Sequence, residues 1–179
     1  MDRFVHKLIS EQRTPPSTEE FRDWENDNHK LPETYLRFMT AFDGGFIYPN
    51  AFYHNTKDPD DWLDDVDDIT HLSHLYSWSA FKKEQSYSHQ AWGQDFVAIG
   101  EEIASGNILM KVAGDETGAI FFWYRNNDSW DDDDGPVPIG KISDSFEAFI
   151  LKDLFTPSDG PDGRWESFFE DGTAEALSF

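Results

Sequence analysis

Two short segments of the chain are dense in aspartate. The first holds seven aspartates within eleven residues, and the second holds five around a tryptophan. The first cluster consists of Asp58, Asp60, Asp61, Trp62, Asp64, Asp65, Asp67 and Asp68, and the second cluster consists of Asp128, Trp130, Asp131, Asp132, Asp133 and Asp134. Carboxylates at this density repel one another, so they are tolerated only in water or against a cationic partner.

Two interpretations of the clusters stay open. Either cluster can be a solvated surface. Alternatively, the row of charges imitates a nucleic-acid backbone and fills a basic cleft, with Trp62 as an aromatic anchor. The second cluster is predicted on a loop between strands, where binding residues are often displayed. A tryptophan in each cluster favours binding.

Neither cluster has the spacing of a calcium loop. An EF-hand needs carboxylates or amides at positions one, three and five, then a glycine, and a glutamate at position twelve. Aligning Gly135 to that glycine puts Trp130 first, and the first cluster contains no glycine. His71 and His74 lie three apart, but the sequence identifies no further ligands for a metal beside them. We expect no metal and no cofactor.

Catalytic templates are also missing. Glu101 and Glu102 are adjacent carboxylates, yet neighbours in a turn after a strand point apart, unlike a glycosidase pair. No G-x-S-x-G elbow, Walker loop, dinucleotide fingerprint or H-E-x-x-H occurs, and the absence of cysteine excludes thiol catalysis. We therefore expect no catalytic residue and no enzyme, with a hydrolase that uses an unrecognised carboxylate site as the remaining catalytic alternative.

The overall charge points to a basic partner. In 179 residues, 36 acidic residues face 14 basic ones, and the formal net charge is -22. Such a surface repels phosphate backbones and anionic lipid headgroups, so we expect neither direct nucleic-acid binding nor membrane binding. The sequence shows neither a signal peptide nor a run of about 18 apolar residues. A cytoplasmic protein is expected.

Helices are predicted before the first cluster. The helical spacing of Phe4, Val5, Leu8 and Ile9 predicts a short helix over residues 2–11. A second helix should begin at the capping-box pair Ser17 and Glu20.

A third helix should follow Pro32, because four apolar residues then repeat on one face. These are Tyr35, Phe38, Met39 and Phe42. Gly44 and Gly45 follow this helix with no strand before them. A phosphate-binding loop needs the reverse order, in which glycines lead into a helix, so we interpret the glycines as a C-cap.

The rest of the chain reads mainly as strands. Pro49 should place residues 46–53 at a sheet edge, and a short helix is predicted around 79–86. Residues 95–125 should form three strands in an antiparallel meander. The third of these, 119–125, is apolar on both faces, which predicts a central strand.

A further strand at 137–142 and a helix that begins at Asp144 complete the expected fold. We predict an α+β domain over residues 1–155, with N-terminal helices and a closing helix around a mainly antiparallel sheet. Residues 156–179 should form a tail that docks on the body through Trp165, Phe168 and Phe169.

The order of these pieces resembles the SUKH superfamily. Its opening signature is similar to Leu31-Pro32, Tyr35, Phe38 and Asp43-Gly44-Gly45, although the family usually has asparagine where Asp43 stands. Its central hairpins are similar to Ile99-Gly100, Gly106-Asn107 and the strand from Gly118 to Tyr124. Its last strand-to-helix junction is similar to "ISDSFEAFI", residues 142–150.

The resemblance implies a binding role. The superfamily includes many bacterial immunity proteins, which neutralise toxins, and a fungal cell-wall synthesis regulator. We expect an immunity protein that binds a basic protein toxin, with a nuclease as the expected toxin class, through the two aspartate clusters. The alternative is an intracellular scaffold or regulatory domain of the SUKH type that inhibits no toxin.

Overall fold

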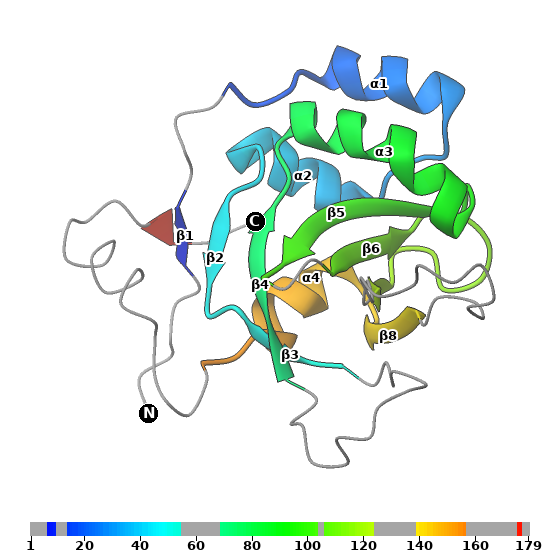
Figure 1. The fold of residues 1–179 in the computed structure, drawn as a ribbon. Helices are drawn as coiled ribbons and strands as arrows, with labels where there is room; N and C mark the ends of the chain where they lie inside the picture. Colours follow the sequence, from blue (N-terminus) through cyan, green and yellow to red (C-terminus); the bar gives the residue numbers. More distant parts are fainter. Residues whose placement is uncertain are drawn as a thin grey trace.

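An antiparallel sheet of six strands forms the centre of the molecule (Figure 1). The computed structural model describes residues 7–9, 14–54, 69–103, 106–123, 139–156 and 175–176, and for 7–9, 86–91 and 175–176 it describes the backbone alone. The helices are α1 (Thr18–Asp27), α2 (Glu33–Phe42), α3 (Trp78–Trp92), α4 (Phe146–Ala148) and the π-helix η1 (Phe149–Asp153). The strands are β1 (Lys7–Ile9), β2 (Phe46–Tyr48), β3 (Ala51–Tyr53), β4 (Ile69–Leu75), β5 (Phe96–Glu102), β6 (Asn107–Lys111), β7 (Ile120–Trp123), β8 (Ile139–Ser143) and β9 (Glu175–Ala176).

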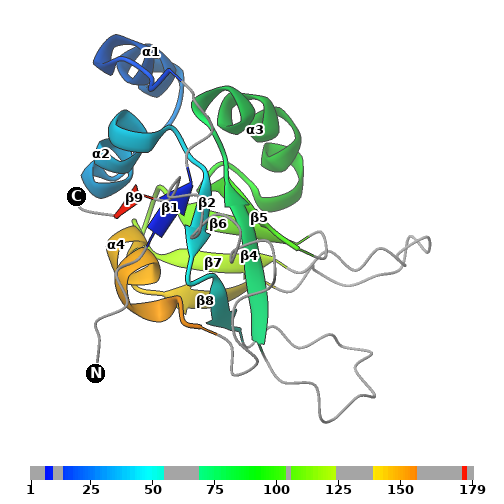
Figure 2. The same ribbon diagram turned by 90° about the vertical axis from the view of Figure 1, so that its left-hand side faces the viewer.

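In the large sheet, the strand order is the sequence order. The large sheet runs β3-β4-β5-β6-β7-β8 with antiparallel neighbours throughout, and a small sheet runs β2-β1-β9. Figure 2 shows α1, α2 and α3 grouped together, while α4 lies beside β8. The predicted α+β class is confirmed, and so is the antiparallel meander.

Aromatic side chains join the helices to the sheet. Tyr35 of α2 is fully buried and lies edge-on to Phe146 of α4, with ring centroids 5.1 Å apart. Phe52 of β3 makes similar contacts with Phe122 of β7 and Phe149 of η1, at 5.5 and 5.8 Å. Burial raises the pKa of Tyr35 above its usual range, with a smaller contribution from Asp43. These contacts build one core from both ends of the chain.

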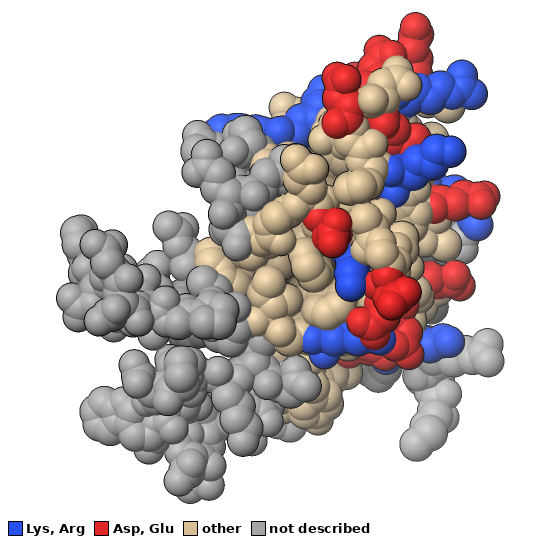
Figure 3. All heavy atoms as spheres, turned by 90° about the vertical axis from the view of Figure 1, so that its right-hand side faces the viewer, with Lys and Arg blue, Asp and Glu red and all other residues tan. Residues whose placement is uncertain are grey.

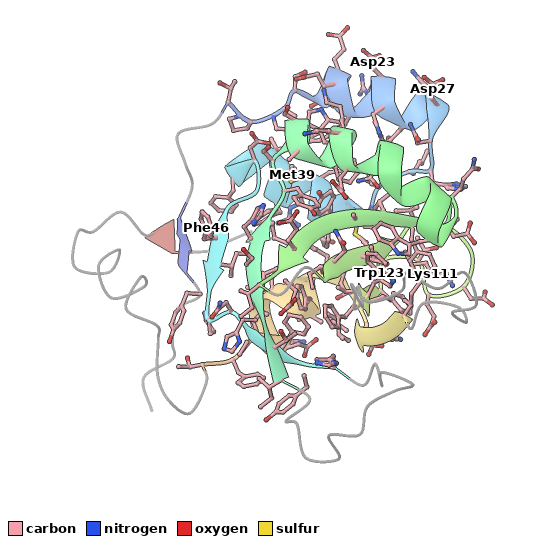
Figure 4. All side chains as sticks on the ribbon, viewed as in Figure 1. Asp23, Asp27, Met39, Phe46, Lys111 and Trp123 are labelled. Carbon is pink, nitrogen blue, oxygen red and sulfur yellow. The ribbon has the colours of Figure 1, made fainter. Side chains whose placement is uncertain are left out.

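Helix α1 begins at the predicted capping box. The Ser17 hydroxyl accepts a hydrogen bond from the Glu20 amide at 3.3 Å, and the Glu20 carboxylate accepts one from the Ser17 amide at 2.9 Å. Both interactions satisfy amide groups that a helix start leaves without partners. Figure 4 shows Asp23 and Asp27 pointing from α1 into solvent, so this helix presents an acidic outer face.

The double glycine after α2 brings two backbones together. Gly45 exchanges two backbone hydrogen bonds with Leu75 of β4, at 3.0 and 2.8 Å. Gly44 has a φ of +79°, and a Cβ on it would lie 2.3 Å from the carbonyl oxygen of Tyr76. Glycine is therefore needed here for close packing. The left-handed C-cap of α2 is Asp43, one residue before the predicted glycines.

Asp43 connects the end of α2 to the start of α3. Its backbone is left-handed at φ 53°, and its amide donates to the Met39 carbonyl at 2.9 Å. Its buried carboxylate accepts a hydrogen bond from the amide of Trp78, the first residue of α3, at 2.6 Å. A negative charge at a helix N-terminus is favourable, so Asp43 ends α2 and also stabilises the start of α3, whose N-cap is Ser77.

The variant Asp43→Ala should lower the free energy of unfolding by about 2 kcal/mol, since alanine is strained in the left-handed region and removes the cap. Asp43→Asn is the matched control, because asparagine tolerates this backbone and keeps the acceptor oxygen. Urea unfolding followed by tryptophan fluorescence measures both variants. Equal losses in the two would show that the carboxamide cannot replace the carboxylate and that charge, rather than capping geometry, dominates.

Helix α3 is longer than the predicted segment 79–86. One of its side chains also makes hydrogen bonds to β5 that a neighbouring strand would otherwise make. Its buried Gln85 side chain donates to the Ala98 carbonyl at 2.9 Å and accepts from the Ala98 amide at 3.1 Å. Strand β4 ends at Leu75, opposite Gly100, and so does not reach Ala98. The glutamine amide therefore completes the hydrogen bonding of β5 where β4 has ended.

Three expectations from the sequence are wrong in part. Lys7–Ile9 forms a strand rather than part of a helix, and it pairs with β2 and with β9 of the C-terminal tail. A helix of ten residues is marginal by itself, and pairing with β2 overrides the apolar spacing. Strand β7 was predicted to be the central strand, but its Phe121 and Trp123 are only half-buried. Strands β5 and β6 are more fully buried.

The third difference concerns the closing helix. Ser145, not Asp144, caps α4, and its hydroxyl accepts from the Ala148 amide at 3.0 Å. The Asp144 carboxylate instead forms an ion pair with Lys141 at 2.7 Å. Asp144 stands one residue before the cap, and its side chain lies against Lys141 instead of accepting from a helix amide.

Candidate functional site

Two connections leave the large sheet at the same end. Tyr53, the last residue of β3, pairs with Ile69, the first residue of β4. Trp123, the last residue of β7, pairs with Ile139, the first residue of β8. The first cluster lies in the sequence between the members of the first pair, and the second cluster lies between the members of the second.

The strands in between establish that the two pairs lie at one end. Leu72 near the start of β4 pairs with Glu102 at the end of β5. Asn107, the first residue of β6, pairs with Glu101 on one side and with Trp123 on the other. We call this part of the molecule the loop end of the sheet (Figure 2). It consists of Tyr53, Ile69, Glu101, Glu102, Ile103, Asn107, Trp123 and Ile139.

The loop end exposes large apolar side chains. In the described part of the chain, three such side chains are exposed: Tyr53 at 64%, Ile103 at 57% and Ile139 at 36%. All three belong to the loop end, on β3, directly after β5 and on β8. Exposed apolar groups are typical of protein interfaces, whose centres are apolar and whose rims are polar.

A polar network lies behind these side chains. The Tyr76 hydroxyl donates to the Glu101 carboxylate and accepts from the Asn107 amide, both at 3.0 Å. Burial, with a smaller contribution from the Glu101 charge, raises the pKa of Tyr76 above its usual range. Tyr76 therefore stays a neutral hydroxyl that joins the end of β4 to β5 and β6.

Glu102 has a different set of partners. Its carboxylate accepts hydrogen bonds from the Thr70 hydroxyl and, at 3.2 Å, from the Gly106 amide. Glu101 and Glu102 thus point to separate partners, as predicted, and do not form a carboxylate pair. Both act as fixed acceptors that hold the loop end together.

The two histidines of β4, His71 and His74, lie on the sheet. The His74 ring lies 5.5 Å from the Tyr76 ring and 5.8 Å from the Phe46 ring, while His71 pairs with Ala51 of β3. Within the described ranges, no three metal-binding side chains come close enough to hold an ion.

Both aspartate clusters lie outside the described residues, so their side chains remain predictions from the sequence. On the face shown in Figure 3, acidic and basic side chains are interspersed. One example is Lys141, which is paired with both Glu116 and Asp144 at 2.7 Å. These pairings lower the pKa of both carboxyl groups and raise that of Lys141. The two clusters, by contrast, contain no basic residue.

The family follows from the comparison with protein-family models. The model of the SMI1 / KNR4 family (SUKH-1) matches residues 15–152. The chain belongs to this family. No curated protein and no solved structure matches the chain.

The match confirms the resemblance to the SUKH superfamily that the sequence predicted. In this SUKH-1 chain the matched residues extend from before α1 into η1, so they include the loop end and both clusters. Membership supports a role of the immunity-protein or SMI1/KNR4 type. None of the helices in the described ranges combines the length and apolar character that crossing a bilayer requires.

The sequence reasoning on this SUKH-1 chain missed Tyr53, Ile103 and Ile139. In an antiparallel meander, every second connection emerges at the same end of the sheet. The predicted strand order therefore already implied that the two connections leave the sheet at the same end. The exposure of the three side chains had no such signal, because apolar residues at strand ends usually pack inward.

Proposed function

We propose that this SUKH-1 chain is an immunity protein that binds and neutralises a cationic bacterial toxin at the loop end, with a nuclease as the expected toxin class. One observation carries the proposal. The segments that hold both aspartate clusters are joined covalently to the sheet end where Tyr53, Ile103 and Ile139 are exposed. Charge and apolar surface are thus available to one partner.

The negative charge of this chain suits a nuclease as the partner better than it suits most other classes of protein. A nuclease must bind phosphates, so its cleft is basic, and a dense row of carboxylates can occupy such a cleft in place of the substrate. Opposite fields also accelerate encounter, which benefits a protein that must block a toxin before damage occurs. The apolar side chains would then slow dissociation, because buried aromatic and aliphatic contacts act mainly on the off-rate.

The described hollows favour binding over catalysis. A hollow of about 390 Å³ near the end of α1 has Asp27 as its one carboxylate. A groove of about 580 Å³ beside η1 has Asp153 as its one carboxylate. A hydrolase would need convergent acids in one cavity, and neither hollow offers two. We accordingly propose a function without chemistry, metal or cofactor.

Co-expression with the product of the adjacent gene tests the proposal. The two proteins should co-purify, and the activity of the partner on DNA or RNA should fall to background at a 1:1 ratio of this chain. The complex should also weaken as salt is raised, since screening shortens the reach of the charges. An adjacent product that does not bind, or that binds and keeps its full activity, would contradict the toxin proposal.

The family description also supports one alternative to toxin neutralisation. A scaffold or regulator of the SMI1/KNR4 type would bind partners and leave their activity unchanged. The same assay separates the two functions, because it records binding and activity independently.

A further inference from the structure

The hollow of about 390 Å³ opens where helix α1 ends. The last turn of α1 supplies one wall, while Val97 of β5 and Val112, which follows β6, supply another. Val97 and Glu102 of the loop end lie five positions apart on β5, which is about 17 Å of strand. The hollow is therefore at the opposite end of the sheet from the loop end and is separate from the surface proposed for the toxin.

The end of α1 leaves hydrogen-bond acceptors without protein donors. The Asn28 backbone amide donates to the Glu25 carbonyl at 3.4 Å, and the Asn28 side chain donates to the Trp24 carbonyl at 2.7 Å. The carbonyls of the last two helical residues, Asn26 and Asp27, accept no hydrogen bond from the described part of the chain. Such carbonyls point beyond the helix end, where a helix carries partial negative charge.

The charge at the hollow is negative. Asp27 supplies its one carboxylate, no lysine or arginine lines it, and the last turn of α1 contains no basic residue. Among the described residues, Asp27 forms no ion pair. Lys111 precedes Val112 in the sequence, but its Nζ lies over the Phe96 ring, 5.9 Å from the ring centroid. A carboxylate beside the negative end of a helix is unfavourable, and a cation placed here would relieve the repulsion.

The remaining lining selects the shape of that cation. Trp24 is half-buried, and its ring makes edge-on contacts with Trp78 and Phe81 at 6.1 and 5.2 Å. Asn28 uses its side-chain nitrogen on the Trp24 carbonyl and keeps its side-chain oxygen as an acceptor, and Gln94 contributes a second amide. A planar guanidinium donates to several acceptors at once and stacks on an aromatic ring, whereas an ammonium is a compact point charge. The hollow therefore suits arginine better than lysine.

We infer that this hollow binds an arginine side chain of a second protein partner, with the guanidinium at Asp27 and the end of α1 and the alkyl stem against Val97 and Val112. Asn26, Asp27 and Gln94 are exposed, so a side chain can enter from the surface. The inference goes beyond toxin neutralisation and does not depend on it, because the two surfaces lie at opposite ends of the sheet.

Two blocked amino acids added to the full chain test the inference. N-acetyl-arginine methylamide and N-acetyl-lysine methylamide carry the same charge and differ in the shape of the cation. In an NMR titration, the arginine probe should bind at least about threefold more tightly, because only the guanidinium offers a planar set of donors. Its largest shifts should occur at Asn26, Asn28, Gln94 and the Trp24 indole. Equal affinities for the two probes, or shifts centred elsewhere, would overturn the inference.

Two aspartates of α1 give matched variants. Asp27→Asn removes the charge at the hollow and should weaken binding of the arginine probe by about threefold or more. Asp23→Asn makes the same change one turn earlier, at an exposed position that does not line the hollow, and should leave the affinity unchanged. Both side chains are exposed, so neither variant should disturb the fold. Equal weakening by the two variants would show that the probe responds to net charge alone and would reject the hollow as its site. The co-expression assay tests toxin neutralisation separately, so either idea can fail without the other.

Discussion

Gly44→Ala should lower the free energy of unfolding by about 3 to 4 kcal/mol, the largest single-residue effect on stability that we expect. Two costs add at this position. The backbone is left-handed at φ +79°, and the new Cβ would lie 2.3 Å from the Tyr76 carbonyl oxygen and 2.7 Å from that of Leu75. These neighbours are backbone atoms of β4 and the segment after it, so no side-chain rotation relieves the contact. Urea unfolding monitored by tryptophan fluorescence measures the change.

Gly114→Ala separates the two costs. Gly114 has a φ of +74°, close to that of Gly44, but nothing lies within 4 Å of its potential Cβ. Backbone strain alone should therefore cost about 1 to 2 kcal/mol. If the two variants lose the same stability, the close approach of the α2–β2 turn to β4 has no energetic weight and the packing role of Gly44 is wrong.

Local signals in the sequence predicted local structure well. The Ser17 and Glu20 pair predicted both hydrogen bonds of the capping box, and Gly44 and Gly45 predicted the end of α2 to within one residue of its C-cap, Asp43. In each case the interacting groups lie within a few residues, so their types and spacing determine the geometry. The antiparallel meander followed from turn residues between apolar runs for the same reason.

Features that depend on distant residues were not predictable. Lys7–Ile9 became a strand because β2 and β9 pair with it, and those strands begin about 40 and 170 residues later in the chain. The role of Gln85 depends on β4 stopping before Ala98, which no local pattern records. The short apolar spacing near the N-terminus fits either a helix or a strand, and only tertiary pairing decides between them.

The candidate site likewise combines features that the sequence shows with features that only the fold shows. Composition identified the two aspartate clusters, because charge density is visible in any stretch of sequence. Their common origin at one end of the sheet required the strand register, from Tyr53 paired with Ile69 to Trp123 paired with Ile139. The hollow at the end of α1 required more, since it forms only where Gln94 and Val112 approach that helix.

If the partner is the basic toxin that we propose, neutralising four charges of the first cluster should slow association with it by about tenfold or more at low salt. The variant replaces Asp61, Asp64, Asp65 and Asp68 by asparagine, which keeps side-chain size and removes the field. The difference from the unaltered chain should shrink as salt rises, because the Debye length falls from about 10 Å at 0.1 M to about 3 Å at 1 M. Stopped-flow association rates at several salt concentrations provide the measurement, and the unfolding free energy should stay unchanged.

A second variant distinguishes the position of the charges from their number. It also removes four negative charges, but from the exposed faces of α1 and α2, away from the loop end, through Glu19→Gln, Asp23→Asn, Asp27→Asn and Glu33→Gln. If the first cluster lies in the interface, this control should retain most of the association rate, because steering depends on charge close to the contact. Equal slowing by both variants would mean that net charge alone steers the partner, and an unchanged rate in the cluster variant would remove the first cluster from the interface. Charge reversal at Asp131 to Asp134 applies the same reasoning to the second cluster, where repulsion of a basic toxin should reduce the rate further than neutralisation does.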